Sequence, residues 1–187
     1  MTFFATSRAV CASFALLLIS MAASAQAQAF DVGGLSYNVT GANNVEVTGR
    51  ASGNTGTVIV IPASVTDSGT TYSVTTIGDL AFYDNSLTSV TIPNSVTTIG
   101  DATFAFNDLT SVTIPNSVTT IGGGAFESND LTSVTISASV TTIGDVAFDS
   151  NDLTSVTFLG NFGAFSLDMF QFNASLETIC TAEGASG

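Results

Sequence analysis

Carboxylates are the most abundant ionisable side-chain groups in this chain of 187 residues. Fifteen aspartate and glutamate residues stand against Arg8 and Arg50, and the sequence contains neither lysine nor histidine. Two carboxylates can act together on a glycosidic bond, whereas the usual nucleophile–base pairs and zinc sites require histidine or several cysteines. Because the acidic residues follow a repeat, they need no catalytic explanation. We therefore predict a protein that is not an enzyme, with no catalytic residues, no cofactor and no metal site.

The acidic residues recur at two fixed positions of that repeat, one after a glycine and one beside an asparagine. The first set is Asp79, Asp101 and Asp145, and the second is Asp108, Asp130 and Asp152. If each set forms a column, neighbouring carboxylates lie on the order of 5 Å apart and repel by about 0.8 kcal/mol per pair in water. We then expect salt or divalent cations to stabilise the fold. The alternative is a solvated acidic edge without a specific ion, since no calcium-loop spacing is present.

A Ser-x-Thr motif recurs in each repeat and supplies the candidate binding residues. They are Ser89, Thr91, Ser111, Thr113, Ser133, Thr135, Ser155 and Thr157. Residues two apart in a strand point to the same side, so stacked copies would form a flat, uncharged face of hydroxyl and methyl groups. This face could bind a protein or a glycan, or its residues could merely solvate the exposed side of the strands. Ice binding is a third alternative, although the motif is not the doubled threonine that an ice-ordering lattice favours.

Asparagine recurs in the same register. The set comprises Asn85, Asn107, Asn129 and Asn151, and Asn173 continues it. An amide has both donors and an acceptor, so a buried column of amides can bond to the turns of its own coil and of the next one. We predict a structural ladder, with catalysis or metal binding as the alternative.

All these positions belong to a unit of 22 residues, whose near-identical copies begin at Leu87, Leu109 and Leu131. Four phenylalanines keep the same step, namely Phe82, Phe104, Phe126 and Phe148. A period in this range is typical of a solenoid whose coils stack one on the next. We predict a β-rich, leucine-rich-repeat-like solenoid of stacked parallel short strands, with the phenylalanines as a second structural ladder.

Each unit can be divided by the spacing of its apolar residues. In the copy from Leu87, a short strand directs Val90 and Ile92 inward, and a second extended piece ends at Ile99. The segment 101–106 is predicted to be a short helical turn that places a phenylalanine in the core. One unit buries too little apolar surface to offset its chain entropy, so neighbouring coils must cover it.

The ends of the solenoid differ from its middle. Alternating apolar residues on both sides of residues 41–44 predict an N-terminal β-hairpin cap, assigned to residues 26–55. Residues 56–187 are assigned to the solenoid, with about five coils and the last one incomplete. The first coil carries an insertion around Asp67–Gly69, predicted to be a projecting hairpin. Larger side chains fill inward positions toward the C-terminus, namely Phe158, Phe162, Phe165 and Phe170.

The first residues, 1–25, have the composition of a secretory signal peptide. A mostly apolar run of 13 residues that ends at Ala22 follows Arg8, and small residues then place the cleavage site near Ala25 or Ala27. This run is shorter than the roughly 20 residues that cross a bilayer, so we expect no membrane insertion. The predicted location is secreted or at the cell surface.

Removal of this leader leaves Cys180 as the single cysteine and Arg50 as the single cation. Cys180 is either an unpaired residue of a terminal coil or a link between two chains, which makes a dimer possible. Fifteen acidic residues against one arginine give the mature chain a formal charge of −14. We expect no nucleic-acid partner and no binding to anionic lipid, because both require clusters of Lys or Arg.

With these positions assigned, the chain resembles the BspA-like leucine-rich repeat family, whose units have 22 or 23 residues. One copy fills the family pattern at Leu109, Val112, Ile114, Pro115, Val118, Ile121, Gly122, Ala125, Phe126 and Asn129. The resemblance implies an exported or surface protein that mediates adhesion, with an extracellular protein or glycan bound at its strand face. The alternative is a structural or truncated repeat segment without a ligand of its own.

Overall fold

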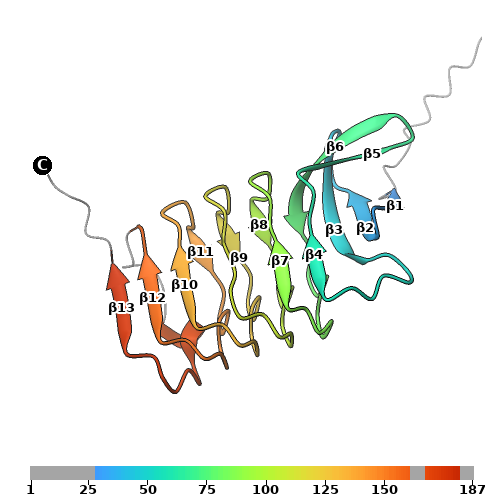
Figure 1. Cartoon of the computed structure of the whole chain (residues 1–187). Helices are drawn as coiled ribbons and strands as arrows, with labels where there is room; N and C mark the ends of the chain where they lie inside the picture. Colours follow the sequence, from blue (N-terminus) through green and yellow to red (C-terminus); the bar gives the residue numbers. More distant parts are fainter. Residues whose placement is uncertain (1–27, 161–166, 182–187) are drawn as a thin grey trace, which may run out of the picture.

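The computed structural model describes residues 28–160 and 167–181 and shows a solenoid with two rows of short parallel strands (Figure 1). The front row consists of β4 (Val58–Val60), β7 (Ser89–Thr91), β10 (Ser133–Ile136), β12 (Ser155–Phe158) and β13 (Thr178–Thr181). The back row consists of β6 (Thr70–Ile77), β8 (Thr98–Ile99), β9 (Thr120–Ile121) and β11 (Thr142–Ile143). The predicted fold class is therefore confirmed. The leader expected at residues 1–25 and the inward positions expected for Phe162 and Phe165 lie outside the described residues.

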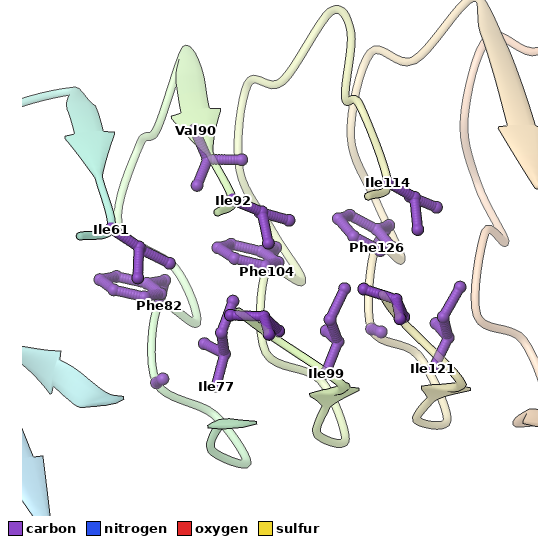
Figure 2. Close-up of a cluster of buried hydrophobic side chains, with 14 of the residues drawn as sticks. Ile61, Ile77, Phe82, Val90, Ile92, Ile99, Phe104, Ile114, Ile121 and Phe126 are labelled. Carbon is purple, nitrogen blue, oxygen red and sulfur yellow. The ribbon is translucent and has the colours of Figure 1, made fainter. Parts of the chain in front are cut away.

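A column of phenylalanine rings runs through the middle of the coils. From Phe82 to Phe170, neighbouring ring centroids are 5.3, 5.4, 5.5 or 5.7 Å apart, and no pair is tilted by more than 24°. Figure 2 shows how Ile92 lies on one side of Phe104, while Ile77 and Ile99 lie on the other. Each coil thus contributes one apolar layer to a continuous core, and the neighbouring coils cover that layer on both sides.

The turn that carries each phenylalanine forms its hydrogen bonds across coils. Residues 101–106 form a compact turn, in which the Phe104 N–H donates to the Ala125 carbonyl of the next coil at 2.8 Å. Equivalent bonds run from Phe82 to Thr103, from Phe126 to Ala147 and from Phe148 to Met169. In the last described coil this position is a 3₁₀ helix, η1 (Leu167–Phe170). In the other coils this segment is a turn rather than a helix. It keeps one internal bond, such as Ala105 N–H to the Ala102 carbonyl at 3.3 Å, and directs other N–H groups to the next coil.

Left-handed backbone makes these cross-coil bonds possible. One position of each turn has φ between 48° and 60°, and it is occupied by Leu80, Ala102, Gly124 and Val146. A second position has φ between 50° and 57°, and it is occupied by Asp84, Phe106, Ser128, Ser150 and Phe172. Such residues cost roughly 1–2 kcal/mol each unless they are glycine, asparagine or aspartate. Stacking of the coils must outweigh this strain.

Asparagine side chains join the coils beside the phenylalanine column. Asn129 Nδ2 donates to the carbonyls of Phe104 in the previous coil (2.9 Å) and Phe126 in its own coil (3.2 Å). Its Oδ1 accepts a bond from the Leu109 N–H at 3.1 Å. Asn107 and Asn151 repeat this pattern, and all three side chains are buried. Each amide therefore satisfies peptide groups of two coils at once.

An antiparallel section covers the N-terminal end of the back row. It consists of β1 (Ala29–Val32), β2 (Leu35–Val39) and β3 (Asn44–Arg50). Strands β2 and β3 form the predicted hairpin, whereas β1 was not predicted. Strand β3 pairs in parallel with β6, so this cap extends the back row and leaves the front row without a covering strand.

The insertion in the first coil is the hairpin of β5 (Ser64–Asp67) and β6, which turns at Ser68 and Gly69. It folds onto the cap and does not project freely, because the Tyr72 ring lies 5.7 Å from the Phe30 ring. Within residues 28–160 and 167–181, no helix has the length and apolar composition needed to cross a bilayer.

We expect Asn129→Ala to lower the free energy of unfolding by at least about 3 kcal/mol, because several buried peptide groups would lose their partner. Urea unfolding followed by circular dichroism measures this change. The matched control is Asn85→Ala in the first coil, where the side chain makes one bond, to the Tyr83 carbonyl, and the expected loss is about 1 kcal/mol. Equal losses at the two positions would contradict the cross-coil role of the amides.

The left-handed positions generate a second prediction. Gly124→Val should destabilise the protein by roughly 1–2 kcal/mol, because a β-branched residue is strained at φ 60°. The matched substitution Val146→Gly, at the equivalent position of the next coil, should stabilise it. Thermal unfolding of both variants tests the pair, and the prediction is wrong if both melting temperatures shift in the same direction.

Candidate functional site

The predicted binding residues lie on the outer side of the front row, which we call the strand face. In the register of β10 and β12, Ser133 pairs with Ser155, and Thr135 pairs with Thr157. Residues of one kind therefore stand side by side in columns. Ser155 and Thr157 are half-buried, and the other six candidate residues are exposed.

The columns begin with two valines that lie outside the Ser-x-Thr motif. Strand β4 pairs with β7 so that Val58 stands beside Ser89, and Val60 stands beside Thr91. The valine side chains are 59% and 65% exposed. The sequence does mark β4 as a strand of the front row, because Pro62 follows it as a proline follows β7. Its outward residues are valines, however, and so do not match the Ser-x-Thr motif. The strand face is thus apolar at its first coil and hydroxyl-rich beyond it.

The strand face is also interrupted in the middle. Residues 111–115 form no strand, and the front row divides there into a β4–β7 pair and a β10–β12–β13 sheet. Val112 is half-buried, whereas Val90 and Val134 at the equivalent positions are buried. Residues 87–100 and 109–122 have identical sequences, so the difference must come from their neighbours. The unbroken ribbon expected from the repeats is therefore not observed.

A surface depression lies at this interruption. Its volume is about 350 Å³. The polar lining consists of Ser111, Thr113, Asn116, Ser133, Thr135 and Ser137, and the apolar lining consists of Val112, Ile114 and Leu159. Four of the eight candidate residues are thus brought together around one hollow. Its hydroxyl and amide groups can donate and accept hydrogen bonds, and no lining residue carries a charge.

The strand face ends at β13, where Cys180 pairs in register with Thr157. Cys180 is exposed and forms no disulfide in the described part of the chain. Its position on the strand face leaves the thiol accessible to a second chain. The dimer through Cys180 stays a prediction.

Two aspartates of the first acidic set, Asp79 and Asp101, bind backbone groups of the next coil. The Asp101 N–H donates to Asp79 Oδ1 at 2.8 Å, and the Gly123 N–H donates to Asp101 Oδ1 at 2.7 Å. Gly123 then interrupts the column before Asp145. Among the described residues, no group of three or more His, Cys, Asp and Glu side chains could hold a metal ion. Stabilisation by salt or divalent cations stays a prediction.

Arg50, at the end of β3, holds the cap against the first coils. Its Nη2 donates to the carbonyls of Asn85, at 3.0 Å, and Gly56. This guanidinium is therefore engaged by backbone oxygens and is not offered to a ligand. Burial also raises the pKa of Tyr37, inside the cap, to about 12, so this phenol stays neutral.

The chain is similar to known repeat proteins. Residues 62–184 match the family model described as BspA type Leucine rich repeat region, in six copies. A solved leucine-rich repeat protein from Bacteroides capillosus is 35% identical with a TM-score of 0.64, and the alignment covers 71% of this chain and 99% of that one. No curated protein matches the chain.

Two further solved structures share the fold at lower identity. The leucine-rich repeat protein TpLRR of T. pallidum is 18% identical with a TM-score of 0.59, and the alignment covers 82% of this chain and 86% of that one. The pneumococcal vaccine antigen PcpA is 17% identical with a TM-score of 0.57, and the alignment covers 84% of this chain and 51% of that one.

Electrostatics at the junction of cap and coils predict a pH dependence of stability. Burial, together with the nearby charge of Asp79, raises the pKa of Glu46. When folding raises the pKa of a carboxyl, the folded protein loses stability as the pH rises through the range between the ordinary pKa and the raised pKa. Glu46→Gln should therefore raise the melting temperature near pH 7 and leave it unchanged at about pH 3. An equal rise in melting temperature at both pH values would show that the ionisation of Glu46 is not the cause.

Proposed function

Since the chain belongs to the BspA-type leucine-rich repeat family, we propose that it is an interaction module whose ligand binds at the strand face. The family match identifies a repeat region and no catalytic domain. The proposed role is adhesion or another form of protein or cell-surface binding, without catalysis.

The observation that supports this proposal most is the depression in the middle of the strand face. Ser111, Thr113, Ser133 and Thr135 come from two coils and line the same hollow. Side chains that merely solvate a strand need not surround a concavity that also has apolar lining residues. Concave sites that combine apolar surface with a few polar groups are typical of ligand binding.

The chemistry of this face indicates the class of ligand. Its hydroxyl and amide groups match the peptide groups of a protein or the hydroxyl groups of a glycan, and Val112 and Ile114 offer apolar contact. The surplus of acidic residues opposes nucleic acid and anionic lipid, which need positive clusters. We therefore propose an extracellular protein or glycan as partner, for a protein that is secreted or held at the cell surface.

Binding of the labelled protein to extracellular-matrix proteins, whole cells and a glycan array tests the proposal. We expect saturable binding that the double variant Thr113→Asp with Thr135→Asp weakens by about tenfold or more, the equivalent of 1.4 kcal/mol. The matched control adds the same charge away from the depression, at the exposed residues Ser86 and Asn43, both changed to Asp. It should bind like the unmodified protein.

Three outcomes would contradict the proposal. If the double variant and its control lose binding affinity equally, the ligand binds elsewhere or the loss reflects the added negative charge alone. Absence of saturable binding would favour a repeat segment without a ligand. Thermal hysteresis of the purified protein, without binding to any of these partners, would favour ice binding.

A further inference from the structure

Strand β4 exposes one edge to which no strand is paired. It is hydrogen-bonded to β7, and no other strand of residues 28–160 and 167–181 pairs with it. The back row differs, because β3 of the cap pairs with β6. Figure 1 shows β4 at the end of the front row, next to the cap. An open edge of this kind is a template for another extended chain.

The register of β4 identifies the peptide groups on this edge. The Ser89 N–H donates to the Thr57 carbonyl, and the Ile61 N–H donates to the Thr91 carbonyl at 3.0 Å. Residues 57 and 61 therefore face β7. Because peptide groups of alternate residues point to opposite sides of a strand, those of Val58 and Val60 face the open edge. Two donors and two acceptors are thus directed at the space beside β4.

At Val60 that space opens into a groove of about 450 Å³, whose other lining residues are Pro62 and residues of the cap and of the β5 hairpin. Its apolar lining consists of Val32, Leu35, Tyr37, Val60, Pro62 and Val65. The volume is within the range of natural ligand sites, roughly 300–1,000 Å³. Backbone groups aligned along an apolar groove match an extended peptide, which presents both a hydrogen-bonding edge and side chains at alternate positions.

Charge restricts which peptide this groove can accept. No residue lining the groove is charged. The chain as a whole carries fifteen acidic residues, and its Arg50 is engaged by the carbonyls of Asn85 and Gly56. An acidic peptide would therefore approach a negative protein in which Arg50, paired with Leu35 of the groove, already donates to backbone carbonyls. A neutral or basic peptide meets no such opposition.

We propose that an extended, neutral or basic peptide segment of a partner protein adds to the open edge of β4 as a further strand. Its backbone bonds to the peptide groups of Val58 and Val60, and an aliphatic side chain enters the groove beside Pro62. This site differs from the depression of the strand face in position and in chemistry. The groove beside β4 is lined mainly by apolar residues and adjoins the backbone of Val60, whereas the depression is lined mainly by hydroxyl and amide side chains.

A synthetic peptide with the sequence of residues 87–94 is the probe, because this sequence already pairs with the other edge of β4 as β7. Fluorescence anisotropy of the labelled peptide measures its binding to the whole protein. We expect saturable binding that Val60→Pro weakens by about tenfold or more, because proline removes a donor on the open edge. Val60→Thr keeps the donor and loses part of the apolar contact, so it should weaken binding by about fourfold or less.

Modified peptides test the strand geometry without changing the protein, which also covers the case of a Val60→Pro variant that fails to fold. Methylation of one alternate set of peptide nitrogens should abolish binding, and methylation of the other set should leave it intact. Adding two lysines to the peptide should preserve binding, whereas adding two aspartates should weaken it at low salt.

Several outcomes would overturn the proposal. They are the absence of binding, equal effects of the two methylated peptides, and unchanged binding to a folded Val60→Pro variant. A concentration-dependent dimer of the protein that Val60→Pro dissociates would identify a second copy as the occupant instead. The variant carrying Thr113→Asp and Thr135→Asp should bind the peptide normally, so failure here is distinguishable from failure of the function proposed for the strand face.

Discussion

Hydrogen bonding between successive coils is the interaction on which the rest of this structure depends. In the turns, peptide N–H groups donate to the coil that follows, and buried asparagine amides bond to two coils at once. The phenylalanine rings then stack at nearly constant distances. The left-handed residues show the strength of this constraint, because even Val146 accepts a strained backbone at φ 53° to maintain it.

The same stacking decides what function the molecule can have. Each outward position becomes a column, so a motif of two small polar residues becomes a surface several coils long. Two of the repeated aspartates, Asp79 and Asp101, bind backbone N–H groups of the next coil. Reactive groups are scarce, whereas contact surface is abundant. For the interaction module that we propose, these properties favour recognition through shape and hydrogen bonding over recognition through charge.

How far the sequence predicts this molecule depends on what is repeated. The 22-residue step was sufficient for the solenoid, its apolar layers and the outward direction of the Ser-x-Thr motif. It was not sufficient where a feature occurs once. Strand β1, the folding of the β5–β6 hairpin onto Phe30, and the place of Val58 and Val60 at the head of the columns all lie in the irregular first part of the chain. Such features have no second copy from which to infer their role.

The sequence by itself determined the period of the coils, the residues that face inward and the absence of histidine and lysine, because these follow from the spacing and type of side chains. Only the tertiary structure decided where the strand face is broken and where an edge is left open. Two copies with identical sequences over residues 87–100 and 109–122 differ in strand pairing. Pairing is a property of two neighbouring segments, and the neighbours of these copies differ. Pairing also decides what the cap covers. Its strand β3 pairs with β6 of the back row and with no other coil strand, so the edge of β4 is left open.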